Sequence, residues 1–115
     1  MDALYHFVIH DIFRPALRGD PDLVQAILES AGEIYFKEND LLFTLPALFD
    51  FVMPRWQESS GACVPLDEGD YKAFRRMFYR NPTNTALREI GGIVVIARAE
   101  KDHERSLYRL TRLAT

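Results

Sequence analysis

The sequence predicts an α+β domain, with a mainly helical N-terminal half and a small antiparallel sheet toward the C-terminal half. Three features predict it: helical spacing of apolar residues in several segments, a β-branched run over residues 93–99, and a polar stretch between that run and a second short apolar segment. The chain has 115 residues, 48% of them hydrophobic and 27% charged, which is ordinary for one folded domain.

Residues 2–13 are expected to form the first helix, although a strand over Leu4–Ile9 is an alternative. Apolar residues surround most of this segment, so the helix is either buried or part of an interface. Pro15 ends or kinks it. Four side chains at helical spacing are our candidates for a dimer or partner interface: Leu4, Phe7, Val8 and Ile12.

The second helix is expected over residues 20–31, because Asp20 can cap it, Pro21 suits its first position and Gly32 stops it. Residues 34–37 and 41–44 form two short strands, or else Asn39 or Asp40 caps a helix there. A further helix enters near Pro46 and runs to Val52, before Pro54. A loop is expected over 57–62.

The C-terminal half begins with a short strand over 63–66 and an amphipathic helix over 68–80 that Asp67 or Asp70 caps. Asn81-Pro82 breaks this helix, and a short helix then runs to Ile90 before Gly91-Gly92. Residues 93–99 are a strand. For residues 106–113 helix and strand compete, and the polar loop before them favours a hairpin.

This order of elements over residues 63–113 resembles the winged helix-turn-helix, a family of DNA-binding domains. The closing segment from Arg105 to Thr111 is similar to the last wing strand of many bacterial regulators. The resemblance implies that the short helix after Pro82 enters the major groove and that the hairpin touches the DNA backbone or the minor groove. Two departures are the single basic residue of that helix, Arg88, and the double glycine after it.

Charge is distributed unevenly along the chain. Residues 1–70 hold four basic and thirteen acidic side chains, a charge of −9, whereas residues 71–115 hold ten basic and four acidic ones, a charge of +6. Such asymmetry indicates a polyanion-binding surface, unless the two halves neutralise each other. The candidate phosphate contacts share one face of the 68–80 helix or flank the hairpin, and the candidate base contacts lie on the short helix. They are Lys72, Arg75, Arg76, Arg80, Arg98 and Arg105 for phosphate, and Asn84 and Arg88 for bases.

The sequence gives little support for metal binding or for catalysis. His6 and His10 are spaced to share a helix face, but they are better explained as interface residues than as metal ligands. Cys63 is the only cysteine and is expected to be structural. We therefore expect no catalytic residue, no metal, no cofactor and no enzymatic activity.

Two functions follow from these observations. The first is a small DNA-binding regulator, dimeric through its N-terminal helix. The alternative is a protein-interaction module, such as an inhibitor, adaptor or immunity-type protein, that docks through its acidic half. A cytoplasmic protein without membrane contact is expected, because no apolar run reaches the length of a span and the segment Ala3–Ile9 lacks a positive leader.

Overall fold

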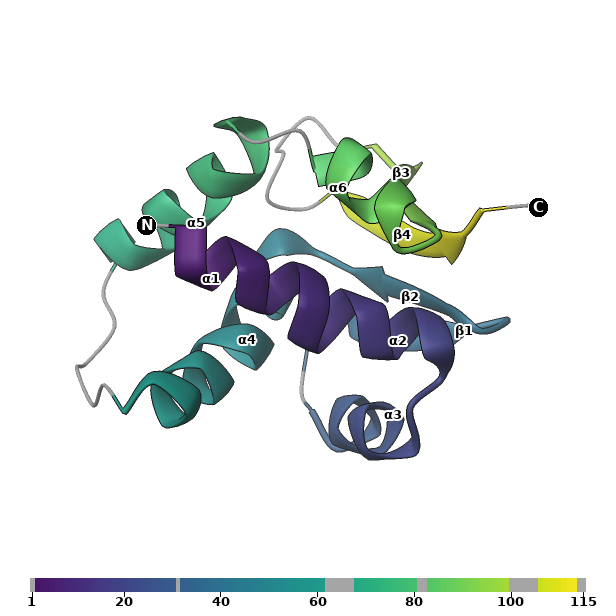
Figure 1. Ribbon diagram of the computed structural model, residues 1–115, viewed down its shortest axis with the longest axis horizontal. Coiled ribbons are helices and arrows are strands. Elements are labelled where there is room, and N and C mark those ends of the chain that lie inside the picture. Colours follow the sequence, from purple (N-terminus) through teal and green to yellow (C-terminus); the bar gives the residue numbers. More distant parts are fainter. Residues whose placement is uncertain (1, 31, 62–67, 81–82, 100–105, 114–115) are drawn as a thin grey trace.

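The computed structural model describes residues 2–30, 32–61, 68–80, 83–99 and 106–113. It confirms the α+β class: helices and one four-stranded antiparallel sheet of order β1-β2-β4-β3. The first helices form a rod along the long axis, with the sheet toward one end and α4 and α5 toward the other (Figure 1). The predicted strand over 63–66 lies outside the described residues.

The rod consists of α1 (Asp2–Phe7), the π-helix η1 (Val8–Phe13) and α2 (Arg14–Arg18). A strand over Leu4–Ile9 is therefore wrong, and Pro15 does not end the helix. Pro15 occupies the first turn of α2, where its missing N–H costs nothing, and the wider π-helical turn precedes it. The Arg14 amide bonds back to the Ile9 carbonyl across this turn. The buried alternative is confirmed, since every apolar residue of η1 is in the core.

Helix α3 (Pro21–Leu28) begins after a capping residue, and the hairpin that follows it turns at two residues with positive φ. The Asp20 carboxylate accepts hydrogen bonds from the amides of Asp22 (3.0 Å) and Leu23 (3.2 Å). Strands β1 (Ile34–Lys37) and β2 (Asp40–Phe43) are joined through Glu38 and Asn39, both at positive φ. That conformation matches the twist of a tight hairpin. The strand alternative is thus confirmed, and the N-terminal half supplies two of the four strands.

Helix α4 (Leu45–Ser60) corrects two predictions. Thr44 caps it and accepts a hydrogen bond from the Ala47 amide, but the helix passes through Pro54 instead of ending at Val52, and residues 57–60 are helical rather than loop. Pro54 is exposed, so its ring lies on the solvent side. The buried Phe51, Val52 and Met53 before it, and the half-buried Trp56 after it, hold both halves against the core. Tertiary packing therefore overrides the local cost of proline.

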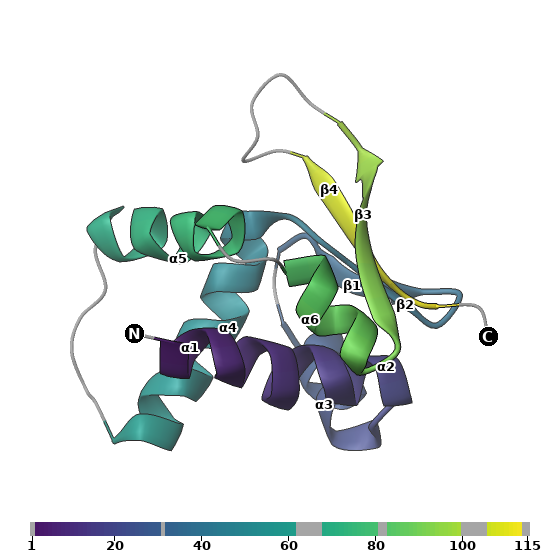
Figure 2. The ribbon, with the colours of Figure 1, turned by 45° about the horizontal axis from the view of Figure 1, so that its top comes forward.

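The C-terminal half contains α5 (Glu68–Arg80), α6 (Thr83–Glu89), β3 (Gly92–Arg98) and β4 (Leu107–Arg112). These confirm the predicted helices and settle residues 107–112 as a strand. Asp70 lies inside α5 and does not cap it. In Figure 2, α5 extends from the far end of the molecule toward α6, which lies against β3.

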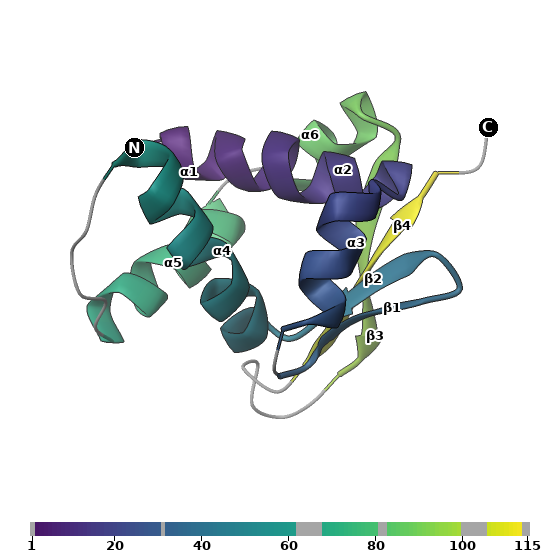
Figure 3. The ribbon, with the colours of Figure 1, turned by 90° about the horizontal axis from the view of Figure 1, so that it is seen from below.

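The sheet joins the two halves of the chain. Strand β4 pairs with β3 on one side and with β2 on the other, with Leu41 opposite Leu110 and Phe43 opposite Tyr108. Helix α2 packs on these two central strands, and α3 packs on β1 (Figure 3). Strands β1 and β3 are the edges, and the β3–β4 register shifts between Ile96 and Arg98.

Candidate functional site

Helix α5 separates apolar from basic side chains as its sequence predicts. Phe74 and Met77 are buried against the core. Lys72, Arg76 and Arg80 are exposed and repeat every four residues, so they form one row along the helix. In the part of the chain that the structure describes, no acidic side chain forms an ion pair with any of the three. We name these three residues the α5 basic row.

Arg75 differs from the other basic residues of α5. It is half-buried, and its guanidinium carbon lies 6.0 Å from the centre of the Tyr71 ring. A cation over an aromatic face is attracted by the ring quadrupole. Arg75 is thus engaged within the helix, and it is a weaker candidate for phosphate than its neighbours.

The arginines of the sheet face the acidic half of the chain. Arg98 pairs with Glu33 at 3.3 Å, and Arg109 lies 3.6 Å from Asp40. The Arg112 side chain donates to the Leu17 carbonyl. Each contact joins the basic half to the acidic half, so the charge asymmetry is partly internal at the sheet. It persists at α5.

The candidate base contacts on α6 have different surroundings. Arg88 is exposed in the last turn, where a cation also complements the helix dipole. The Asn84 carboxamide is occupied: its nitrogen donates to the Val94 carbonyl (3.1 Å), and its oxygen accepts from the Val94 amide (2.8 Å). Asn84 therefore fastens α6 to β3 and has no free edge for a base. Arg105 lies outside the described residues.

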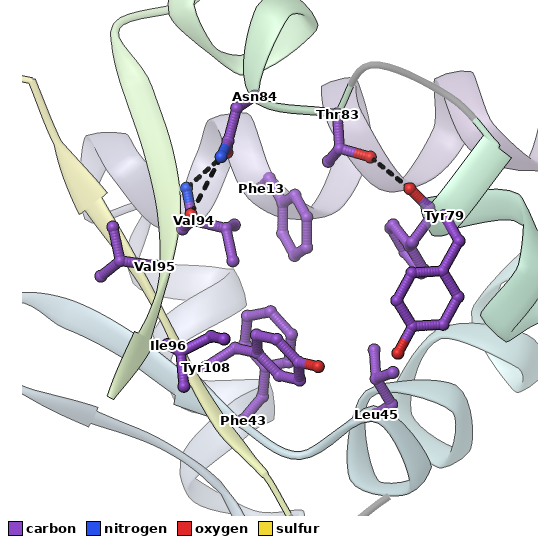
Figure 4. A pocket seen from close by; sticks show the side chains of 11 residues that line it. Phe13, Phe43, Leu45, Tyr79, Thr83, Asn84, Val94, Val95, Ile96 and Tyr108 are labelled. Carbon is purple, nitrogen blue, oxygen red and sulfur yellow. Dashed lines mark hydrogen bonds between the residues drawn. The ribbon is translucent and has the colours of Figure 1, made fainter. Parts of the chain in front are cut away.

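A cavity of about 290 Å³ lies where α5, α6 and the sheet meet (Figure 4). Tyr79 stands on one side, Val94 and Ile96 on the other, and Phe43 and Tyr108 between them. The aromatic rings of Phe13, Phe43 and Tyr108 stack in succession, with centroids 5.6 and 5.9 Å apart. The remaining lining residues are Leu45, Phe78, Thr83, Asn84 and Val95. We name this cavity the aromatic pocket.

The aromatic pocket gathers apolar side chains that solvent reaches. Five large hydrophobic residues are exposed among the described residues, and three of them line this pocket: Tyr79 (60%), Val95 (42%) and Ile96 (61%). Exposed apolar side chains that occur singly need no explanation, but a cluster beside a cavity is typical of a binding site.

The polar groups of two residues of the aromatic pocket, Thr83 and Asn84, already have partners. The Thr83 hydroxyl donates to the Phe78 carbonyl at 3.2 Å, and Asn84 is held by Val94. Burial, and next a hydrogen bond with Tyr79, raises the pKa of Tyr108 from 10.0 to about 12. The pocket thus offers ring faces and methyl groups, but few free hydrogen-bonding edges.

The proposed interface residues of the first helix are mostly interior. Val8 and Ile12 are fully buried within a single chain, so the core accounts for their apolar character. Leu4 and Phe7 are half-buried, and the Phe7 ring meets Trp56 edge-on with centroids 5.5 Å apart. Of these four residues, only Leu4 and Phe7 keep some exposed surface that a partner could contact.

The two histidines of the first helix stack on each other. The rings of His6 and His10 lie 5.4 Å apart with an interplanar angle of 17°, and both residues are exposed. Across the described ranges, no three His, Cys, Asp or Glu side chains come together as metal ligands would. Cys63 lies outside those ranges.

Sequence reasoning identifies α5 and misses the aromatic pocket. The sequence predicts Tyr108 only as part of a wing strand, and nothing in it links this residue to Tyr79 or Phe43. The pocket residues extend from Phe13 to Tyr108, so no local spacing signals them.

No family model, curated protein or solved structure matched this chain when each was compared with it. Every helix of the described part is too short or too polar to cross a lipid bilayer.

Proposed function

We propose that this chain is a small nucleic-acid-binding regulatory protein rather than an enzyme, and that the α5 basic row is its phosphate-binding surface. The observation that carries the proposal is the contrast between two groups of basic residues. The sheet arginines are engaged with the acidic half, whereas Lys72, Arg76 and Arg80 are exposed without an acidic partner among the described residues. Uncompensated cations in one row suit a polyanion, because each phosphate they neutralise releases counterions.

The proposed nucleic-acid-binding surface includes fewer residues than the sequence suggests. Arg98 contributes less than its charge implies, because Glu33 already pairs with it, and Asn84 does not read bases while it holds Val94. Dimerisation through Val8 and Ile12 is not part of the proposal, since both are buried in one chain. Binding is therefore expected to depend on charge more than on base sequence.

Fluorescence anisotropy with a labelled oligonucleotide at about 50 and 200 mM salt tests this proposal. The logarithm of affinity should fall linearly with the logarithm of salt concentration, and removing one phosphate contact lowers that slope by about 0.7–0.9. Arg76→Ala and Arg80→Ala should each produce this change. Arg18→Ala removes the same charge from an exposed site in α2 and should not. No binding at low salt, or equal slopes for all variants, would overturn the proposal.

A protein-interaction module is the second candidate, and one feature of the surface favours it. A depression of about 560 Å³ lies between α3 and α4, and its charged lining consists of Glu29, Asp50 and Glu58 with one arginine, Arg55, so that acidic groups predominate. An acidic depression attracts a basic partner. This function predicts a stable complex in a pull-down from the native cell that added nucleic acid does not disrupt. It also predicts that charge reversal at Asp50 and Glu58 abolishes the complex.

A further inference from the structure

We infer that the aromatic pocket holds one unstacked base of a single-stranded nucleic acid, whose neighbouring phosphates lie on the α5 basic row. This inference rests on the proposed function and adds the form of nucleic acid that the surface recognises. It begins from one residue that belongs to both features, because Tyr79 lines the pocket and lies on the basic face of α5.

The position of Tyr79 places charge next to the pocket. Arg76 precedes it by three residues and shares its helix face, whereas Arg80 is the next residue and lies about 100° around the helix axis. The row starts at Lys72 and advances about 6 Å for every four residues. It runs toward the C-terminal end of α5, which is the end that leads to α6 and the pocket (Figure 2). A single-stranded nucleic acid that follows the α5 basic row therefore reaches the aromatic pocket.

The size and lining of the pocket suit one flat ring. Its volume of about 290 Å³ is at the lower limit of small-molecule sites, which matches a single base better than a larger ligand. Tyr79 and Tyr108 offer aromatic rings, Ile96 offers an exposed aliphatic side, and Phe43 is stacked between Phe13 and Tyr108. Bases stack on such faces, and basic grooves that hold single strands combine the two features.

The same lining predicts that the aromatic pocket accepts any of the bases. Thr83 and Asn84 direct their polar atoms to intramolecular partners. A base in the pocket is therefore held by its face and is not read along its edge, and face stacking is available to every base. A duplex is excluded from this mode, because its bases are stacked inside and opening them costs energy.

The experiment compares three labelled probes of equal length: a dT single strand, a duplex, and a strand of abasic sites with the same phosphates. We expect the dT strand to bind about 5- to 100-fold more tightly than the other two, since one base–aromatic stack is worth about 1–3 kcal/mol. Tyr79→Ala should lower dT affinity about 5- to 100-fold and leave the abasic probe unchanged. Tyr79→Phe should retain binding.

Controls separate failure of this inference from failure of the proposed function. Tyr35→Ala makes the same change at another exposed tyrosine, on β1, and should bind like the parent. Equal affinity for all three probes, lost on Arg76→Ala but not on Tyr79→Ala, would overturn the base pocket and keep the phosphate surface. No binding of any probe would overturn both. Because Tyr79 is largely exposed, its replacement should leave the fold intact, as circular dichroism would verify.

Discussion

Asn84 pairs with Val94 as a neighbouring strand would, through one hydrogen bond given and one received by the same backbone residue. Val94 faces Leu110 of β4 on its other side, so its outward amide and carbonyl would otherwise form part of an open sheet edge. Open edges invite pairing with other chains. The side chain of α6 thus closes β3 at this residue and fixes the wall of the aromatic pocket.

Replacing Asn84 should loosen this junction. Asn84→Ala should lower the free energy of unfolding by about 1 kcal/mol, because it leaves both Val94 groups without their partner. Asn84→Asp keeps the acceptor and loses the donor, so an intermediate loss is expected. Urea unfolding measures both. Thr85→Ala, at an exposed neighbour in the same helix, should change stability by less than about 0.5 kcal/mol. Equal stability of the Asn84 and Thr85 variants would contradict this account.

The glycine before β3, Gly91, and the first residue of β3, Gly92, should respond differently to replacement by alanine. A Cβ at Gly92 would lie 2.5 Å from Leu17 Cδ1, and Leu17 is itself buried, so Gly92→Ala should cost about 1–3 kcal/mol. Gly91 has open space around it but a φ of +85°, so Gly91→Ala should cost about 1–2 kcal/mol through the backbone alone. Thermal unfolding in a Leu17→Ala background distinguishes the causes. The loss at Gly92 should shrink there, and the loss at Gly91 should not.

The Tyr108 hydroxyl should lose its proton at a higher pH than an ordinary tyrosine does. Its pKa is raised to about 12 from 10.0, which means that the folded state holds the phenolic proton more tightly than the unfolded state. The resulting stabilisation is complete below pH 10 and is lost as the pH rises through 12. Near-ultraviolet absorbance should show the phenolate signal of one tyrosine appearing near pH 12. That signal should vanish in Tyr108→Phe and persist in Tyr35→Phe. A late step that survives Tyr108→Phe would assign it to another residue.

The buried residues of the first helix should contribute to the free energy of unfolding by packing in the core of the single chain. Ile12→Ala should reduce the free energy of unfolding by roughly 2–5 kcal/mol, because Ile12 is fully buried in the single chain. Leu28→Ala, at a side chain 67% exposed, should change it by less than about 0.5 kcal/mol. Light scattering should give the same molar mass for parent and variants. A variant that dissociates while keeping its stability would instead place Ile12 in an interface.

The predicted elements that proved right carry their signals locally. Asp20-Pro21 begins α3, and the β-branched run forms β3, because caps and β-branched side chains act within a few residues. Residues 107–112 are ambiguous alone, and pairing with strands on both sides settles them. The course of α4 through Pro54 and the π-helical turn at Val8–Phe13 depend on packing that no local pattern records.

The candidate site likewise has one part that local sequence patterns predict and one part that they do not. The amphipathic spacing of α5 is enough to predict that Lys72, Arg76 and Arg80 share one exposed face. The pairing of Arg98 with Glu33 spans 65 positions, and the aromatic pocket draws on distant segments. Such contacts follow from the sheet order, which local patterns in the sequence do not determine.

The central position of β4 has a consequence for biosynthesis. A nascent chain that has not yet reached residue 107 can form the β1–β2 hairpin but cannot close the sheet, because β2 then lacks its second neighbour and β3 lacks its only one. Strand pairing across such long separations is slow to form and leaves apolar edges exposed in the meantime. The growing polypeptide therefore depends on a late segment to bury Leu41 and Phe43, and a ribosome stalled before that point would release a species prone to aggregation.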